Sequence, residues 1–360
     1  MADTKILITD NIDIWTSALQ TKSGVGRGNS KKLNLYGIKN CGIDSGTSRL
    51  VNNILVQTYW NIGKRIVDHE QQGDVKAEYG SRLLKELSSD LKSRYGKGFS
   101  RSNLQYMRLL YIKFPIYQTL SGKLTWSHYT ELLSISDDLA RSFYEKQCVS
   151  DNWSVRELKR QRQTGLFERI ALSSDKSDIM ELAQNGQIIN ESNDIIKDPY
   201  VFEFLQIPMT QRYSEKELEK RLLDNLGQFL LELGKGFAFI GSQYRITLNN
   251  THYYTDLVFY HRILKCFVLI DLKLGKVNHQ VIGQMNMYLN YFKEEENTPD
   301  DNPPVGIVLA ADKDEILVDY ATGSISNQLF VSKYQLYIPD KKILENELRL
   351  LMAREQSSDE

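Results

Sequence analysis

The segment CFVLIDLKLGK, residues 266–276, places an acid and a lysine in a mostly apolar run. The apolar and β-branched residues at its start are typical of a buried strand, and strand side chains alternate between the two faces of a sheet. Asp271 and Lys273 therefore share one face, whereas Ile270 and Leu272 lie on the other. An ionised pair in a central strand is costly unless it has partners or binds a metal ion. The pair is thus either an ion pair at a strand edge or part of a functional site.

A second acid, Asp256, lies in the preceding β-rich run, residues 252–260. Residues 261–265 connect the two runs at a length that suits a β-hairpin, which would bring Asp256 near Asp271. Two carboxylates at about 4–6 Å repel each other unless a cation lies between them. Oxygen ligands of this kind suit Mg²⁺ or Mn²⁺. We therefore expect a divalent metal site, with Lys273 beside it to orient or activate a water molecule.

The helices on either side of these strands carry further polar candidates. In the helix before the sheet, Glu217 lies at capping-box spacing from Ser214, whereas Glu219 continues a stripe of leucines. We expect Glu217 to be structural and Glu219 to point toward the core, where it can complete the metal site. In the helix after the strands, Gln284 and Tyr288 lie four residues apart on an inward stripe. Gln284 is therefore placed to hydrogen-bond the metal site or a phosphate.

The C-terminal half as a whole, residues 206–354, predicts an α/β domain with a mixed sheet, followed by a tail at 355–360. The expected helices cover residues 214–233, 279–296 and 341–355, and the expected strands cover 237–248, 252–260, 266–274, 303–311 and 327–339. Residues 166–205 mix acids, serine and asparagine without a clear period, so we expect a junction between domains there.

The N-terminal half begins with residues 1–48, which have no sustained period and predict an irregular arm. Residues 49–165 are helical in pattern and form the second expected domain. Two of its helices are joined by GKGFS, residues 96–100, whose serine is expected to cap the later helix. This pattern indicates either a helix-turn-helix or an ordinary bundle corner. The polar face of its second helix carries Arg101, Asn103, Gln105 and Arg108.

A basic stripe follows in WSVRELKRQRQ, residues 153–163. Its cations fall within about two turns of a helix, where a nucleic-acid backbone could bind them. The alternative is an ordinary helix end on the surface. The basic residues are Arg156, Lys159, Arg160 and Arg162.

The composition limits the function classes. The 360 residues are enough for two domains, and 45 basic against 46 acidic side chains give a net charge of −1. No whole-chain field attracts nucleic acid or membrane, so any polyanion site must be local. Three widely spaced cysteines argue against a disulfide framework or zinc site. No signal-peptide pattern or membrane-length apolar run is present in the sequence, so we expect a cytoplasmic protein without membrane contact.

The order of these polar residues resembles the PD-(D/E)-x-K nuclease superfamily, including its Q-x-x-x-Y accessory motif. Longer stretches are similar to the YhcG-type family of bacterial proteins over roughly residues 49–354, among them LVNNILVQTYWNIGKRIV, YGKGFSRSNLQYMR and YYTDLVFYHRILKCFVLIDLKLGK. The resemblance implies a helical, DNA-binding N-terminal domain and a restriction-endonuclease-like C-terminal domain. It places the metal acids at Asp256 and Asp271, the lysine at Lys273, the helix glutamate at Glu219 and the accessory pair at Gln284 and Tyr288. Thr255 stands where the superfamily name has proline, a common departure.

A second resemblance concerns residues 10–39, which are similar to the opening segment of type I restriction specificity subunits. It indicates a restriction or defence locus, with restriction-system subunits as partners. The resulting hypothesis is a Mg²⁺-dependent DNA endonuclease, expected to be a homodimer because cutting both strands of a duplex needs two sites. The alternative is a DNA-binding or assembly subunit of a defence complex whose nuclease fold is silent without partners. RNA as the substrate also remains open.

Overall fold

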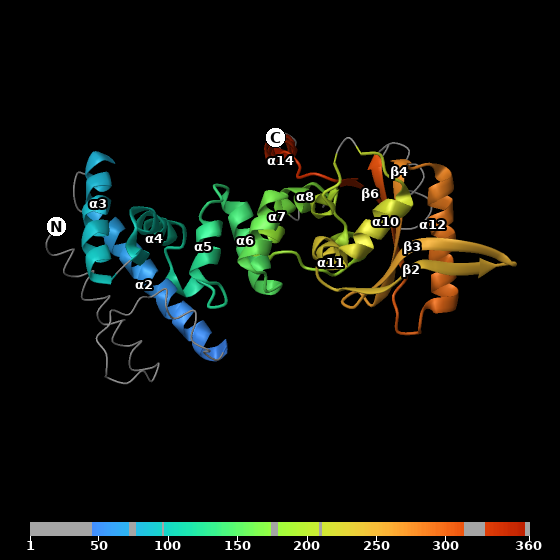
Figure 1. Ribbon diagram of the computed structural model, residues 1–360, viewed down its shortest axis with the longest axis horizontal. Coiled ribbons are helices and arrows are strands. Elements are labelled where there is room, and N and C mark those ends of the chain that lie inside the picture. Colours follow the sequence, from blue (N-terminus) through green and yellow to red (C-terminus); the bar gives the residue numbers. More distant parts are fainter. Residues whose placement is uncertain are drawn as a thin grey trace. The chain divides into compact units, whose positions relative to one another are not determined.

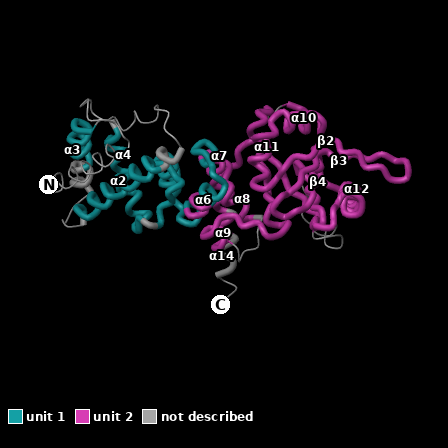
Figure 2. Tube along the Cα trace, turned by 90° about the horizontal axis from the view of Figure 1, so that it is seen from below, with its two compact units in different colours: residues 1–141, 147–158 teal, residues 142–146, 159–360 magenta. Residues whose placement is uncertain are grey.

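The computed structural model describes residues 45–71, 77–95, 97–173, 179–208, 211–312 and 328–356. The chain divides into two compact units (Figure 2). The first comprises residues 1–141 with 147–158, and the second comprises residues 142–146 with 159–360. Most of the predicted arm and the end of the predicted tail lie outside the described residues. Residues 45–48 belong to a helix, which therefore begins before the predicted start at Arg49.

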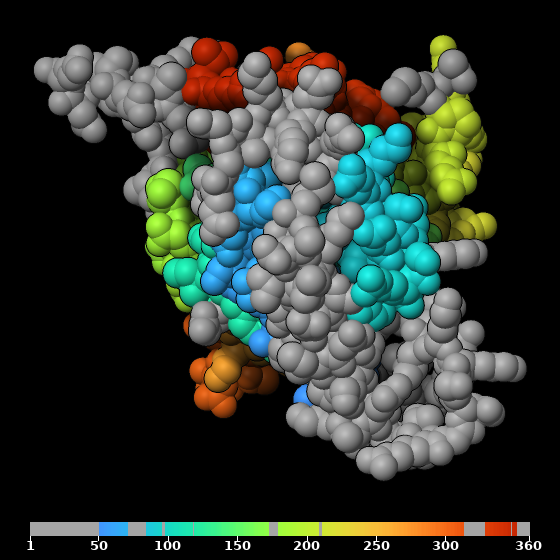
Figure 3. Space-filling view, turned by 90° about the vertical axis from the view of Figure 1, so that its left-hand side faces the viewer, coloured from blue at the N-terminus to red at the C-terminus, as the bar shows by residue number. Residues whose placement is uncertain are grey.

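The N-terminal part of the chain is helical, as predicted. Its elements are α2 Ser45–Gln71, α3 Ala77–Tyr95, η2 Lys97–Phe99, α4 Arg101–Lys113, η3 Tyr117–Thr119, α5 Trp126–Leu132, α6 Asp138–Ser150 and α7 Val155–Gln163. One apolar cluster joins α2, α3 and α4, with Ile62, Leu87 and Met107 almost wholly buried. The outer surfaces of α2 and α3 are the blue and cyan areas of Figure 3.

The close approach of α2 to α4 depends on Gly63. A Cβ atom at this position would lie 1.9 Å from the carbonyl oxygen of Met107, and backbone cannot yield as a flexible side chain can. The predicted cap of α4 is confirmed, because the Ser100 hydroxyl accepts the N–H of Asn103 at 3.1 Å. The corner between α3 and α4 is therefore fixed by a cap and by the buried Phe99.

The second unit contains a six-stranded mixed sheet in the order β1-β6-β5-β4-β3-β2 (Figure 1). The strands are β1 Tyr200–Val201, β2 Phe237–Leu248, β3 Thr251–His261, β4 Cys266–Lys276, β5 Val305–Asp312 and β6 Leu329–Gln335. β2, β3 and β4 are antiparallel, whereas β4, β5, β6 and β1 are parallel. The mixed sheet was predicted, but β1 was not, because its two residues lie in the expected junction.

Helices cover both faces of this sheet. On one face, α10 Glu215–Asp224 and α11 Leu226–Leu233 pack over Leu257, Ile270 and Leu272. On the other, α12 His279–Tyr291 and the adjoining η7 Phe292–Glu296 pack over Val258 and Leu269. The remaining elements are α8 Leu166–Ser173, α9 Ile179–Asn185, η5 Ser192–Ile195, η6 Glu203–Leu205 and α14 Lys341–Gln356. Across the described ranges, the helices are all too short or too polar to span a bilayer.

The single helix predicted over residues 214–233 is wrong, since the structure breaks it at Asn225. Both the backbone N–H and the side-chain amide of Asn225 donate to the carbonyl of Arg221, at 3.1 and 2.9 Å. An asparagine side chain that competes for backbone acceptors in this way favours the end of a helix. The change of direction separates α10, which carries Glu219, from α11, which carries Glu232.

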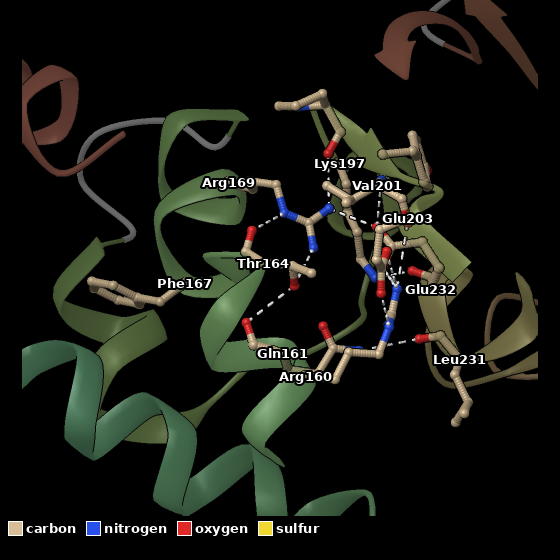
Figure 4. Close-up of polar contacts among 12 residues, drawn as sticks. Arg160, Gln161, Thr164, Phe167, Arg169, Lys197, Val201, Glu203, Leu231 and Glu232 are labelled. Carbon is tan, nitrogen blue, oxygen red and sulfur yellow. Dashed lines mark hydrogen bonds and ion pairs between the residues drawn. The ribbon is translucent and has the colours of Figure 1, made fainter. Parts of the chain in front are cut away.

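Glu232 is the centre of a buried polar network within the second unit (Figure 4). Its carboxylate accepts from Arg169 Nη1 at 2.6 Å, from Arg160 Nη2 at 3.0 Å and from the backbone N–H of Val201 at 3.0 Å. Arg160 also donates to Glu203 through Nε at 2.7 Å. The prediction that Arg160 lies on a surface basic stripe is therefore wrong, because its guanidinium is held inside this network.

The same network contains Lys197, whose ammonium group donates to the carbonyl oxygen of Glu232. Burial alone would raise the pKa of Glu232, but the positive charges of Arg169, Lys197 and Arg160 outweigh it and lower the pKa to about 2. The carboxylate is thus charged at neutral pH, and the three cations compensate its charge. The network ties the end of α7, from residue 159 onward, and α8 to β1 and α11, all within the second unit.

Candidate active site

The hairpin of β3 and β4 brings Asp256 beside Asp271. Leu257 pairs with Ile270 in the antiparallel register. Asp256 precedes Leu257 on β3 and Asp271 follows Ile270 on β4, so the two acids occupy neighbouring positions. Asp256 Oδ2 accepts the backbone N–H of Leu272 at 2.8 Å, which fixes this carboxylate against β4. The two acids thus lie where β3 begins to separate from the sheet.

Asp271 and Lys273 form the polar pair of β4. Lys273 Nζ lies 2.8 Å from Asp271 Oδ2 and 3.8 Å from Glu215 Oε2. Asp271 is only 4% exposed, and β4 lies between β3 and β5, so the pair is not at a sheet edge. Burial and the negative charge of Asp256 raise the pKa of Asp271 to about 6, although Lys273 opposes the rise. The site therefore holds more negative charge than its lysine balances.

The same surroundings also shift the pKa of Lys273. Burial acts to lower the pKa of its ammonium group, but the negative charges of Asp271, Asp256 and Glu215 outweigh burial, so its pKa lies above the ordinary value. Lys273 is consequently a fixed positive charge next to the acids. Glu215 holds this end of the site to α10, since its Oε1 also accepts the N–H of Leu274 at 3.1 Å.

Glu219 points inward from α10, as predicted, and is 7% exposed. Its Oε2 accepts from Gln243 Nε2 at 2.8 Å, and the same nitrogen donates to Asp256 Oδ1 at 3.1 Å. Burial and the charge of Asp256 raise the pKa of Glu219, whereas the hydrogen bond from Gln243 lowers it. The neighbouring Glu217 closes a capping box with Ser214, which confirms its structural role.

Sequence reasoning missed Gln243, the residue that bridges two of the acids. Its φ of 48° is unusual for a residue other than glycine and asparagine, and it falls in the middle of β2. It lies opposite Asp256, between the pairs Ser242–Leu257 and Tyr244–Thr255. That register follows a shift between Phe239 and Gly241, which no sequence pattern specifies. Only the folded hairpin reveals Gln243 as a site residue.

The accessory pair on α12 is placed differently from the prediction. Gln284 Nε2 donates to the hydroxyl of Tyr288, and that hydroxyl donates to the carbonyl of Tyr254 at 3.1 Å. Tyr288 is buried, whereas Gln284 is exposed. Gln284 therefore positions Tyr288, and through it β3 next to Asp256, whereas its hydrogen bond to the metal site or a phosphate stays a prediction.

The donor chemistry of the site fits a hard divalent cation. Asp256 and Asp271 offer adjacent carboxylate oxygens, and Glu219 is held nearby through the amide of Gln243. Within the described part of the chain, no three His, Cys, Asp or Glu side chains are already gathered as a ready-made metal cluster. The two aspartates are therefore the core of the site, and Glu219 is its more distant member.

The residues of the helical part that are predicted to bind nucleic acid fall into two groups. Asn103 donates to the carbonyl of Gly98 and accepts from Trp126 Nε1 at 2.9 Å, so its amide is used within the fold. Arg108 forms an ion pair with Glu70 at 2.7 Å. The residues whose side chains are exposed are Arg101, Gln105, Arg156 and Lys159. The exposed group keeps the prediction open, whereas Asn103 is better explained as structural.

Two known protein families match this chain and define its class of protein. Residues 193–349 match the family described as the YhcG PDDEXK nuclease domain, and residues 44–169 match the DUF1016 N-terminal domain. The mixed sheet with its acid and lysine pair on β4 is thus a PD-(D/E)xK nuclease domain that follows a helical domain.

The family is given by a full-length relative. An Escherichia coli (strain K12) protein named "Putative nuclease YhcG" is 41% identical over 334 residues, which are 84% of this chain and 88% of the relative. The chain belongs to the YhcG family. Two Escherichia coli type I restriction specificity subunits match more locally. The EcoEI subunit is 30% identical over 40% of this chain and 22% of its own length. The EcoAI subunit is 64% identical over 9% of this chain and 6% of its own.

Proposed function

We propose that the chain is a Mg²⁺-dependent endonuclease that hydrolyses phosphodiester bonds of DNA. The observation that carries the proposal is the excess of negative charge at the half-buried Asp256 and the buried Asp271 beside a single lysine, Lys273. A nuclease needs such a site to hold a divalent cation against the phosphate.

Each residue has a distinct role in this proposal. Asp256 and Asp271 would hold the ion, with Glu219 as a third carboxylate, and the ion would polarise the phosphate and acidify a bound water. Lys273 would donate to a phosphate oxygen as charge develops there. Gln243 keeps Glu219 and Asp256 in a fixed relation, and Gln284 and Tyr288 hold the backbone of β3.

Cleavage of labelled plasmid, linear, branched and RNA substrates tests the proposal. The full chain should cut DNA in millimolar-range Mg²⁺ and stop on chelation, whereas Asp271→Ala and Lys273→Ala should not cut although both remain folded. Lys276→Ala is the matched control, because this lysine lies on the same strand and is 68% exposed. Calorimetric titration with Mn²⁺ adds a readout without turnover, and Asp271→Ala should weaken binding strongly.

Two outcomes would change the proposal. Cleavage of RNA but not DNA would show that the substrate class is wrong. DNA binding without cleavage by the wild type and both variants would favour the alternative, a DNA-binding or assembly subunit of a defence complex whose nuclease fold is silent alone. The local likeness to restriction specificity subunits motivates this alternative and the proposed defence role.

We propose further that the helical domain presents DNA through its exposed polar residues. The candidates are Arg101, Gln105, Arg156 and Lys159. Replacing Arg156 and Lys159 together by alanine should weaken DNA binding for all sequences and lower the salt dependence by about two. Unchanged binding and salt dependence would assign these residues to an ordinary surface.

A homodimer is the expected active form, since two sites related by a two-fold axis would cut both strands. Sedimentation with and without duplex DNA measures this directly. A monomer at all concentrations, in both conditions, would contradict it.

A further inference from the structure

The β2–β3 hairpin continues well beyond the site residues. Past Gln243 and Asp256 the two strands remain paired as far as Leu248 and Thr251, and a turn at Asn249 and Asn250 joins them. Figures 1 and 2 show this end of the hairpin projecting past α12. This long extension is therefore directly attached to the candidate active site.

The two faces of the extension differ. On the inner face Ile246 is fully buried, and Tyr244, Leu248 and Tyr253 pack with it against the cluster that contains α12 and η7. This packing holds the extension in place. The strand register places four other side chains on the opposite, outer face, with Arg245 across from Tyr254 and Thr247 across from His252. We refer to Arg245, Thr247, His252 and Tyr254 as the hairpin face.

The hairpin face is exposed and has no acid. All four residues are exposed, and Tyr254 retains 48% of its accessible surface. Thr247 Oγ1 and His252 Nδ1 lie 2.9 Å apart, so this pair is preorganised as one polar group. Residues 237–255 contain no aspartate or glutamate, in a chain that has 46 of them. Arginine, threonine, histidine, tyrosine and asparagine at the turn can all donate hydrogen bonds to phosphate.

The spacing also fits a nucleic-acid strand. Antiparallel strands rise by about 3.4 Å per residue, so Tyr254 and His252 lie about 7 and 14 Å along β3 from Asp256. These distances correspond to about two and four base pairs of B-form rise. A duplex that lies along the hairpin, with its scissile phosphate at Asp256 and Asp271, would have neighbouring phosphates of one strand beside the hairpin face.

On the basis of the proposed nuclease function, we propose that the hairpin face binds the backbone of duplex DNA to one side of the cleaved phosphate. Arg245 supplies the charge that contacts phosphate, and the Tyr254 hydroxyl supplies a neutral hydrogen bond. The inner-face packing on α12 fixes the ribbon relative to the acids, so the face sets the register of the duplex in the site. It is a substrate-positioning surface, since none of its residues touches the reacting atoms.

Equilibrium binding to a labelled duplex tests the proposal, in the full chain with Asp271→Asn as a background that does not cut. Arg245→Ala should raise Kd by about tenfold and lower the slope of log K against log salt by about one. Tyr254→Phe should raise Kd about threefold and leave the slope unchanged, because the hydroxyl is uncharged. Arg262→Ala is the matched control, an exposed arginine at the opposite end of β3 that should bind as the background does.

The outcomes separate this inference from the nuclease proposal. If the wild type cuts DNA but Arg245→Ala and Tyr254→Phe bind with unchanged Kd and slope, the hairpin face is not a DNA surface and the nuclease proposal stands. If Arg262→Ala weakens binding equally, the effect is general charge loss and the inference is wrong. Loss of single-stranded RNA binding with duplex DNA binding intact would also overturn it. If the wild type neither binds nor cuts DNA, both proposals fail.

Discussion

Two buried carboxylates of the second unit, Glu232 and Asp271, have opposite electrostatic environments. Glu232 is surrounded by Arg169, Lys197 and Arg160, which lower its pKa to about 2. Asp271 has one lysine and a second acid beside it, and its pKa rises to about 6. Burial alone would raise the pKa of both, so the difference comes from the neighbouring charges, three cations at Glu232 against one cation and one acid at Asp271.

Glu232 carries a structural charge, whereas the charge of Asp271 fits the proposed metal site. Around Glu232 the fold itself supplies compensation, and the cations come from segments distant in sequence. Around Asp271 the fold leaves the negative charge in excess, which a cation from solution can balance. A buried acid in this domain is therefore informative only when its partners are counted.

Removing the functional charge should have the largest effect on activity. Asp271→Asn is expected to lower single-turnover cleavage about a thousandfold or more, because a neutral amide cannot replace a carboxylate ligand. The free energy of unfolding should not fall, since the substitution removes a buried charge that lies beside Asp256. Cleavage rates and urea unfolding of the same preparation measure both effects. Near-normal cleavage would show that Asp271 is not a residue of the active site.

Removing the structural charge should instead act on stability. Glu232→Gln is expected to lower the free energy of unfolding by about 3–5 kcal/mol, because it leaves the buried Arg169 without its counter-charge and leaves Arg160 with Glu203 alone. Urea unfolding measures the loss, and Asp224→Asn, an exposed acid on α10, is the control. A loss no larger than that of the control would mean that the network adds little net stability.

The bridging amide should have an intermediate effect. Gln243→Asn tolerates the left-handed backbone but is too short to bridge Glu219 and Asp256, so we expect cleavage about tenfold slower and weaker Mn²⁺ binding by calorimetry. Gln228→Asn, exposed on α11, is the matched control. Unchanged metal binding together with unchanged cleavage would make Gln243 a backbone feature only.

Acid should reduce the stabilising effect of Glu232. A carboxyl whose folded-state pKa of about 2 lies below its ordinary value of 4.5 stabilises fully above pH 4.5, and this stabilisation is lost as pH falls toward 2. The difference in unfolding free energy between wild type and Glu232→Gln should therefore be constant from pH 7 to about pH 5 and then narrow. Urea unfolding across this range measures the trend, and a difference that widens in acid would contradict the assigned charge state.

The sequence predicts the residues of the candidate site better than it predicts the contacts between distant segments that hold them in place. The alternation in β4 and the hairpin length place Asp271, Lys273 and Asp256 together, because these are local rules of strand geometry. The stripe of leucines on its helix likewise places Glu219 inward. The resemblance to the PD-(D/E)xK superfamily points to the same residues in the same order along the chain. Local periodicity is enough wherever one element determines the direction of a side chain.

The parts that the sequence does not predict depend on contacts between distant segments. Arg160 lies in an apparent surface stripe, yet Glu203 and Glu232 draw it inward. Gln243 reaches the acids only through a register shift in β2, and the break at Asn225 depends on a competing side-chain hydrogen bond. None of these has a periodic signature, since each is decided by tertiary structure.

The pairing of β1 with β6 has a consequence for biosynthesis. Tyr200 and Val201 find their sheet partners, Tyr334 and Gln335, only in β6, and Asp198 accepts the N–H of Lys333 there. Contacts of such sequence separation form late, and domains are completed as the chain emerges from the ribosome. The sheet that supports the acids is therefore unfinished until β6 has been translated, so a nascent chain that stops before β6 lacks the strand pairing that completes this sheet.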